Sequence, residues 1–355
     1  MVRYLKANEK EQCRLLWNEA FSEDSPAFVD YYFEEKTKDN RVLVREEAGV
    51  IQSMLHLNPY CLAVKDGTWT VDYIVGVATR ADCRRRGYMR ELMDEMFRNL
   101  WGREMPFVYL MPAAKEIYEP FDFVYIYDQP VWQLKGGVEP GRQQLLTGSR
   151  IAGGEQWDTV SEWMNRWLKD RYQVYAVRDR AYLERLGKEL VSEQGQLELL
   201  CEQNHITGVY AEWGTKAREQ RLLYTEEAEV ELVDKKPAIM ARIVNLNAFL
   251  SRICLNSFYI KEEIQILLLL TDEWIPENHG LWVWNLTKEK SWVMPVPADE
   301  VPLRAAELDR GSQPVLELTI GELTSWLFGY SLPEAARTYE NTVAALQGVF
   351  LDEVV

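Results

Sequence analysis

Histidine and cysteine are scarce in this sequence, which limits the chemistry that it can support. The three histidines, His56, His205 and His279, lie far apart and lack partners at the spacing of a metal site or a catalytic triad. We therefore predict that they are structural, and we predict no metal. The five cysteines are odd in number and contain no CxxC pair, so neither a disulfide framework nor a zinc site is expected. A reducing compartment, the cytoplasm, fits this usage. The cysteines are Cys13, Cys61, Cys83, Cys201 and Cys254.

Long apolar runs and an excess of positive charge are also missing. No apolar run reaches the roughly 18 residues that cross a bilayer, and the start of the chain reads as a strand without a signal peptide. The chain has 40 Lys+Arg against 56 Asp+Glu, a net charge of −16. Such a surface repels phosphates and anionic membranes, so we predict neither a nucleic-acid nor a membrane partner. It weakly favours a cationic substrate such as an amine.

The chain has ample apolar material for several cores. It has 355 residues, of which 47 % are hydrophobic and 12 % aromatic, and this length suggests two or three domains. Alternating patterns predict an antiparallel meander after one or two helices over residues 9–37, with Ser22 or Asp24 as a cap. We place the first domain at residues 1–134. The expected strands cover residues 3–7, 41–46, 50–57, 60–64, 68–79, 107–111 and 121–134.

The pattern starts again after a Gly/Pro-rich linker at residues 135–142. Two helices and a hairpin, at 196–202 and 206–213, echo the first domain without its basic turn, so residues 135–237 are predicted to be a degenerate copy. Residues 238–355 form a third, α+β domain with helices expected at 321–328 and 332–346. The predicted fold class of all three domains therefore mixes helices and strands, α/β (α+β).

A basic, glycine-containing turn joins the strand 68–79 to an amphipathic helix. The turn reads Cys83-Arg84-Arg85-Arg86-Gly87, and the helix follows at once. Unpaired N–H groups and the macrodipole make a helix N-terminus an anion site, and a glycine allows close backbone approach. We predict that the amides from Arg85 to Arg90 hold a pyrophosphate. Solvated arginines on an ordinary strand–helix turn are the alternative.

This stretch resembles motif A of the GNAT acetyltransferases, Gln/Arg-x-x-Gly-x-Gly/Ala. Arg84, Gly87 and Met89 occupy its three defined positions. Met89 departs from the usual small residue, and together with the repeated arginines it is similar to the Eis-like ("enhanced intracellular survival") members. The resemblance implies acetyl-CoA as cosubstrate. The cofactor-binding residues that it implies are Val77, Ala78, Thr79, Arg84, Arg85, Arg86, Gly87, Tyr88, Met89, Arg90, Ala113 and Ala114.

A tyrosine segment follows the strand 107–111. The run Lys115-Glu116-Ile117-Tyr118-Glu119-Pro120-Phe121-Asp122-Phe123 resembles the family's tyrosine segment, with Asp122 in place of its glycine. On this match Tyr118 is the general acid. Its reference pKa near ~10 keeps it protonated and able to donate to a thiolate of reference pKa about 8.5. An aromatic plug at a helix end is the alternative interpretation.

The chain ends in an apolar segment, Phe350-Leu351-Asp352-Glu353-Val354-Val355, that reads as packed rather than frayed. In Eis-like enzymes the C-terminal carboxylate is the base, and the match gives this role to Val355. A free α-carboxyl has a low reference pKa of about 3.5, so it needs desolvation or a water relay. Glu353 and Asp24 are alternatives for holding a cationic acceptor.

The resemblance spans the whole chain. It implies tandem GNAT folds, each a mixed, mostly antiparallel sheet with helices on both faces, followed by a sterol-carrier-protein-like domain, and it implies a homo-oligomer, often a hexamer. The expected activity is direct acetyl transfer from acetyl-CoA to a primary amine in an aminoglycoside, a polyamine or a lysine. A non-catalytic acyl-CoA or lipid sensor on the same fold and an oligomeric scaffold remain alternatives.

Overall fold

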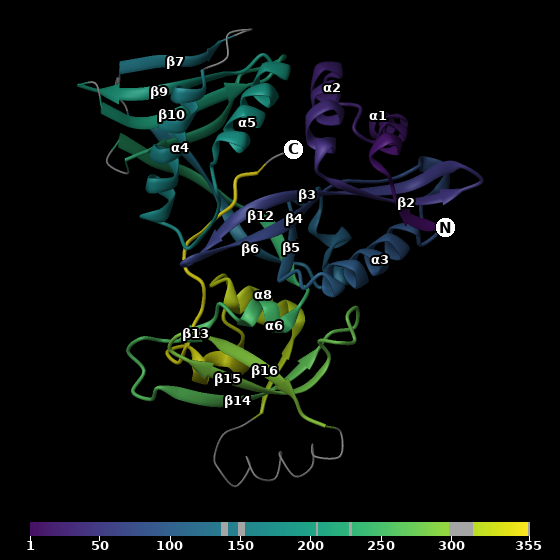
Figure 1. The fold of residues 1–355 in the computed structure, drawn as a ribbon, viewed down its shortest axis with the longest axis vertical. Helices are drawn as coiled ribbons and strands as arrows, with labels where there is room; N and C mark the ends of the chain where they lie inside the picture. Colours follow the sequence, from purple (N-terminus) through teal and green to yellow (C-terminus); the bar gives the residue numbers. More distant parts are fainter. Residues whose placement is uncertain (136–140, 148–152, 204, 227–228, 298–314, 354–355) are drawn as a thin grey trace.

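The chain is organised as three blocks stacked along its longest axis. The structure, a computed structural model, describes residues 1–135, 141–147, 153–203, 205–226, 229–297 and 315–353. Figure 1 shows a large sheet in the middle, a smaller sheet with two helices at one end, and a third block at the other end. Mixed sheets and helices recur in these blocks, so the predicted α/β class is confirmed.

The central sheet has nine strands, with the main order β1-β2-β3-β4-β5-β12-β6. Neighbours on this path are antiparallel except β4 and β5, which are parallel. β8 pairs with the last residues of β3, and β19 pairs with β8. The bounds are β1 Val2–Tyr4, β2 Arg41–Glu47, β3 Val50–Val64, β4 Gly67–Thr79, β5 Phe107–Leu110, β6 Val124–Leu134, β8 Val174–Ala176, β12 Val230–Ile243 and β19 Val349–Phe350.

Both faces of this sheet are covered by helices. Side chains alternate along β2, so Val42 and Val44 join the core under α1 and α2, whereas Leu43 joins the core under α3. The N-cap of α2 is Ser25, whose hydroxyl accepts from the Phe28 N–H, and not Ser22 or Asp24 as predicted, because Pro26 fits the first helical position. The bounds are α1 Arg14–Ala20, α2 Pro26–Glu35 and α3 Tyr88–Gly102, with 3₁₀ turns η1 Ala7–Cys13, η2 Lys36–Lys38, η3 Ala81–Cys83, η4 Lys115–Ile117 and η5 Glu119–Phe121.

The second block is a four-stranded antiparallel sheet of order β11-β10-β9-β7 with two helices beside it. The predicted helices and hairpin are present. Asp179 caps the second helix, because its side chain accepts from the Tyr182 N–H. The bounds are β7 Gly141–Thr147, α4 Gly154–Lys169, α5 Arg180–Ser192, β9 Gln196–Glu202, β10 His205–Trp213 and β11 Glu219–Thr225.

The third block packs a four-stranded sheet, β16-β15-β14-β17, against two short helices. The helix expected at 332–346 is wrong: this stretch holds a 3₁₀ turn and then β18, whose backbone pairs with β13. The bounds are α6 Leu246–Leu250, β13 Cys254–Leu255, β14 Glu263–Thr271, β15 Gly280–Thr287, β16 Ser291–Pro295, β17 Leu316–Thr319, α8 Ile320–Leu327, η7 Glu334–Tyr339 and β18 Val343–Ala344.

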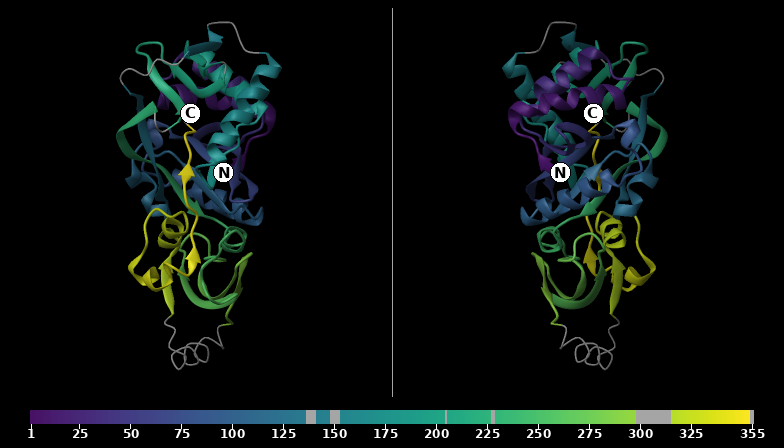
Figure 2. Two further views of the ribbon diagram at one scale, coloured as in Figure 1. Left: turned by 90° about the vertical axis from the view of Figure 1, so that its left-hand side faces the viewer. Right: turned by 90° about the vertical axis from the view of Figure 1, so that its right-hand side faces the viewer.

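Two segments tie the blocks together. β12 crosses the predicted limit between residues 237 and 238 and inserts into the central sheet between β5 and β6. The C-terminal segment leaves the third block, pairs as β19 with β8, and ends between the other two blocks (Figure 2). Residues 349–353 are therefore brought to the junction of the first two blocks.

Candidate active site

The parallel strands β4 and β5 separate soon after they meet. Their pairing comprises Tyr73 with Tyr109 and Ile74 with Leu110, whereas β4 continues to Thr79. On its other side β4 stays paired with β3, up to Thr79 opposite Ser53. The predicted residues Val77 to Thr79 therefore lie on a stretch of β4 for which the described residues give no partner on the β5 side. Such a backbone edge can accept an extended ligand as an added strand.

Gly76 bends β4 at the point of separation. Its φ is 60°, and the register with β3 shifts between Met54 and His56. A Cβ at this position would lie 2.5 Å from the Trp17 ring. The bulge is therefore possible because glycine tolerates both the left-handed backbone and the close approach of Trp17. The prediction missed this residue, although a lone glycine inside a strand pattern is a signal for a bulge.

The basic turn follows the C-terminal end of β4. Arg84, Arg85, Arg86 and Gly87 are exposed, and Arg85 and Gly87 have positive φ values of 64° and 83°. Gly87 is the N-cap of α3 and supplies no side-chain cap. The first-turn amides of α3 are therefore available to an anion, and the exposed arginines surround them.

The individual side chains of the turn point in different directions. The Arg84 Nε donates to the Thr79 carbonyl at 3.3 Å, and the Arg86 guanidinium donates to the Asp82 carbonyl at 2.9 Å. The buried Tyr88 turns inward and donates its hydroxyl to Glu47. Tyr88, one of the predicted binding residues, can therefore contact a bound anion through its backbone but not through its side chain.

Two further predicted binding residues of α3 are partly engaged by other parts of the chain. Met89 is half-buried against the main core. The Arg90 guanidinium lies 4.7 Å from the centre of the Trp274 ring of the third block. The indole N–H of Trp274 donates to the Pro120 carbonyl at 3.0 Å. The third block therefore contacts both the start of α3 and the segment that follows β5.

Tyr118 follows β5, so it lies at the same edge of the sheet as the basic turn, because β4 and β5 are parallel. Its side chain is 7 % exposed, and burial raises the pKa of Tyr118 to about 12. The ring lies 6.0 Å from Phe123. Asp122 adopts the left-handed conformation, φ 60°, that a glycine would favour here. Ala113 and Ala114, in the extended stretch before Tyr118, are exposed.

A buried charge cluster holds the end of the chain. Arg178 donates to Asp352 and to Glu353 Oε1, the latter at 2.6 Å, and it is fully buried. Tyr224 donates to Asp352 Oδ2 at 2.6 Å, and the Arg221 guanidinium donates to the Asp352 carbonyl at 3.0 Å. Burial raises the pKa of Glu353, and Arg178 opposes this shift. Val355, the predicted base, lies outside the described residues.

Several buried polar atoms near this cluster have no hydrogen-bond partner among the described residues. They include the Tyr109 hydroxyl on β5, the Tyr127 hydroxyl on β6, Glu353 Oε2 and the Nε atoms of Arg178 and Arg221. A cavity of about 600 Å³ is lined by Tyr127, by Asp352 and by Met111, which directly follows β5. Such unsatisfied buried groups indicate a site for a polar ligand or water. The prediction named Glu353 as an alternative but missed Arg178 and Arg221, which carry no sequence motif.

Residues 1–126 match the family model of an acetyltransferase (GNAT) domain. No curated protein sequence matches the chain. The matched range contains the separated strands, the basic turn and Tyr118. The chain therefore carries a GNAT N-acetyltransferase domain, and the prediction of an enzyme of this type is confirmed.

Solved structures resemble the whole chain in fold. A protein of Enterococcus faecalis described as a probable N-acyltransferase has a TM-score of 0.74 at 16 % identity and covers 98 % of this chain and 93 % of its own. A GCN5-related N-acetyltransferase of Kribbella flavida has 0.71 at 13 %, covering 100 % and 98 %. Eis1 of Mycobacterium abscessus has 0.68 at 12 %, covering 100 % of both chains. The arrangement of all three blocks thus recurs in these proteins.

Among the described residues there is neither a metal-binding group nor a membrane-spanning helix. No group of three or more His, Cys, Asp or Glu side chains is placed to hold a metal ion. No described helix is both long enough and apolar enough to cross a membrane.

Proposed function

We propose that the chain transfers an acetyl group from acetyl-CoA directly to a primary amine. The observation that carries this proposal is the separation of β4 and β5, with an anion-accepting turn after one strand and a buried tyrosine after the other. Pantetheine bound along Val77, Ala78 and Thr79, with its pyrophosphate at residues 84–90, would bring the thioester to this opening. Ala113 and Ala114 would flank the bound cosubstrate.

The proposed chemistry needs one acid and one base. The neutral amine attacks the thioester carbon, the C–S bond of the tetrahedral intermediate breaks, and Tyr118 gives its proton to the departing thiolate. A carboxylate accepts the proton lost by the amine. The resemblance to Eis-like enzymes suggests the C-terminal carboxylate of Val355 as this base, with Glu353 as the alternative. Burial keeps Tyr118 protonated, as an acid must be.

A cationic acceptor suits the cluster at the end of the chain. Glu353 is 1 % exposed, and its Oε2 lacks a partner among the described residues. An ammonium group would donate to that oxygen and to the nearby tyrosine hydroxyls, whereas an anionic acceptor would be repelled by the carboxylate. The bound ammonium would then lose a proton to the base before it attacks the thioester. An aminoglycoside, a polyamine and a lysine side chain all present such a group.

The direct test is thiol release from acetyl-CoA in the presence of a panel of amines. Tyr118→Phe should reduce kcat by about 10²-fold or more, in the range of general acid catalysis, and leave CoA affinity unchanged. Tyr4→Phe is the matched control, because Tyr4 also has a buried hydroxyl but lies on the edge strand β1. Equal activity of Tyr118→Phe and the native chain would remove the general-acid role. CoA binding with no turnover on any amine would favour the sensor alternative.

The base can be tested separately. Extending the chain by one residue moves the terminal carboxylate, whereas Glu353→Gln removes only the side-chain charge. A large loss of kcat on extension, with CoA binding retained, supports Val355; a loss confined to Glu353→Gln transfers the role to Glu353.

We also propose that residues 1–134, 135–237 and 238–355 form a catalytic GNAT domain, a GNAT-like copy without cosubstrate and a sterol-carrier-like domain. The protein would act in the cytoplasm as a homo-oligomer, often a hexamer in Eis-like proteins, with neither nucleic acid nor membrane as partner. The exposed Phe258 and Ile260, at 93 % and 95 %, support self-association of the third block. Light scattering of the native chain and of the double variant Phe258→Ser/Ile260→Ser tests this.

A further inference from the structure

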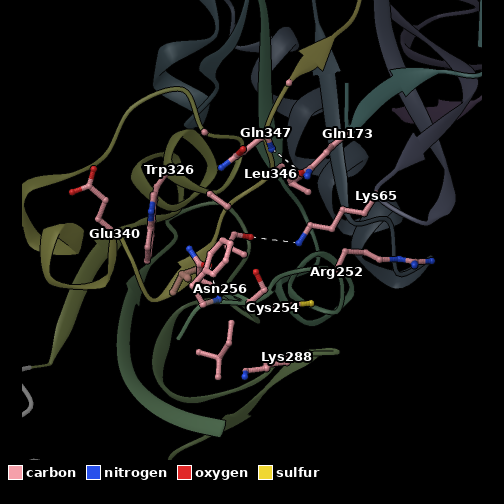
Figure 3. Close-up of a pocket in the computed structure, with 18 of the residues that line it drawn as sticks. Lys65, Gln173, Arg252, Cys254, Asn256, Lys288, Trp326, Glu340, Leu346 and Gln347 are labelled. Carbon is pink, nitrogen blue, oxygen red and sulfur yellow. Dashed lines mark hydrogen bonds between the residues drawn. The ribbon is translucent and has the colours of Figure 1, made fainter. Parts of the chain in front are cut away.

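A second, larger cavity lies where the three blocks meet. It has a volume of about 1040 Å³ and takes its walls from the β3–β4 turn, the residue before β8, the stretch after α6, the β15–β16 turn and the C-terminal segment 343–348. Figure 3 shows Lys65, Gln173, Arg252, Asn256, Lys288 and Leu346 around it. Its volume is typical of a site for a small organic molecule.

The positive charges of this cavity are not equally paired. Arg252 forms an ion pair with Asp66 at 3.2 Å, and Lys288 forms one with Glu262 at 2.9 Å. Lys65 has no carboxylate within ion-pair distance among the described residues, and its Nζ reaches only the Ala344 carbonyl, at 3.4 Å (Figure 3). The acidic residues of the lining, Asp66, Glu289 and Glu340, are exposed. Asp66, the next residue, acts on Lys65 electrostatically but forms its ion pair with Arg252. Lys65 is therefore a half-buried lysine that forms no ion pair with the described residues, in a chain of net charge −16.

The backbone at Lys65 is also unusual. Its φ is 53°, a left-handed conformation that costs a residue other than glycine or asparagine about 1–2 kcal/mol. Its N–H donates to the Gln173 carbonyl at 2.8 Å, which fixes the turn against the second block. Burial lowers the pKa of Lys65. A positive φ also occurs at other turns, for example at Ala48 and Gln203. It is the ammonium group in the cavity wall, which forms no ion pair with the described residues, that suggests a functional reason for lysine there.

We propose that this cavity binds a small oxyanion, a carboxylate or phosphate compound, with Lys65 as its counter-ion. The site is distinct from the one proposed for CoA. Lys65 lies two residues before the start of β4 and the basic turn follows the end of β4, so a strand of 13 residues separates them, about 40 Å at ~3.3 Å per residue. The pyrophosphate of CoA therefore does not account for Lys65.

The wall of the cavity continues into the candidate active site. Gln173 donates its N–H to the Gly348 carbonyl at 2.9 Å, and its side-chain oxygen accepts from the Gln347 N–H at 2.9 Å. Gly348 has φ 64°, and a Cβ there would lie 2.9 Å from the Arg171 carbonyl, so the segment is closely held. β19 and Asp352 follow within four residues. An oxyanion bound at Lys65 therefore contacts the same segment that carries the buried carboxylates to the acetyl-transfer site.

The test uses the full chain without acetyl-CoA, so it does not depend on the proposed activity. Inorganic phosphate and citrate are titrated by calorimetry in a buffer of low chloride, with glucose as a neutral control. Lys65→Asn removes the charge and also relieves the backbone strain, because asparagine tolerates the left-handed conformation. Lys290→Gln is the matched control: it removes one positive charge from the β15–β16 turn, which borders the cavity, but Lys290 does not line the cavity.

We expect one anion equivalent to bind, with affinity reduced about tenfold or more in Lys65→Asn and unchanged in Lys290→Gln. The melting temperature of Lys65→Asn should be equal to or above that of the native chain. Saturation with CoA should leave the anion affinity within about twofold. The proposal would be overturned if neither anion binds the native chain, if Lys290→Gln loses as much anion affinity as Lys65→Asn, or if CoA competes with the anion.

Discussion

Arg178 is the residue whose replacement tests most directly how the end of the chain is held. It is fully buried, donates to Asp352 and Glu353, bonds the Tyr224 hydroxyl at 3.1 Å and lies 4.3 Å from the Tyr182 ring centre. Arg178→Met would keep most of the volume and leave two buried carboxylates without their counter-charge. Removing one partner of a buried ion pair costs about 3–5 kcal/mol. Part of this cost would be relieved by local undocking of residues 349–353.

The assay is urea unfolding combined with hydrogen exchange of residues 349–353. We expect Arg178→Met to lower the free energy of unfolding by about 3 kcal/mol or to increase exchange in that segment by about 10²-fold, which is the same energy expressed locally. The combination Arg178→Met/Asp352→Asn/Glu353→Gln should recover most of this loss, because no unpaired charge remains buried. Acetyl transfer should stay low in both variants if Glu353 holds the acceptor. A cost below about 1 kcal/mol, or no recovery in the triple variant, would refute the reasoning.

Three further measurements follow from the geometry. Gly76→Ala should lower the free energy of unfolding by about 2–3 kcal/mol and raise the KM for acetyl-CoA, because the new Cβ would clash with the Trp17 ring. Gly49→Ala is the control, because Gly49 has φ 78° but nothing lies within 4 Å of its Cβ position; it should lower the free energy of unfolding by about 1 kcal/mol and leave KM unchanged. Since burial raises the pKa of Tyr118 to about 12, kcat should show no alkaline loss below about pH 11, whereas an ordinary tyrosine would lose its proton near pH ~10. Burial lowers the pKa of His56 to about 3, so as pH falls below ~6.5 the unfolded chain takes up a proton first. The free energy of unfolding, measured by urea titration, should therefore fall by about 2 kcal/mol between pH 7 and pH 5, and His56→Gln should remove this pH dependence.

Local patterns predicted the parts of the site that lie within one element and its neighbours. The helix after Gly87 was predicted from its apolar spacing, and Leu92, Met93 and Phe97 are fully buried as that spacing requires. The turn Arg84–Gly87 and the tyrosine after β5 were also found, because each is a short run with its own chemistry. These features depend on contacts within a few residues, which a single sequence records directly.

The missed features depend on pairs of residues that are far apart in the chain. Arg178 and Glu353 are separated by 175 positions, and neither stands in a recognisable run. The insertion of β12 between β5 and β6 could not be predicted from its alternation alone, since alternation gives the faces of a strand but not its neighbours. The missing α-helix at 332–346 has the same cause, because Val343 and Ala344 pair with β13 instead.

The buried carboxylates and the separated strands depend on each other through β8. This strand pairs with the end of β3 on one side and with β19 on the other, so it joins the central sheet to the C-terminal segment. Arg178 lies two residues after β8, and it is held from the other side by the helix α4, where Ser161 and Asn165 bond its backbone carbonyl. A change that displaces β8 would therefore move Arg178 and both carboxylates together. For this reason a change in the second block would alter the proposed acetyl-transfer site through β8 and Arg178.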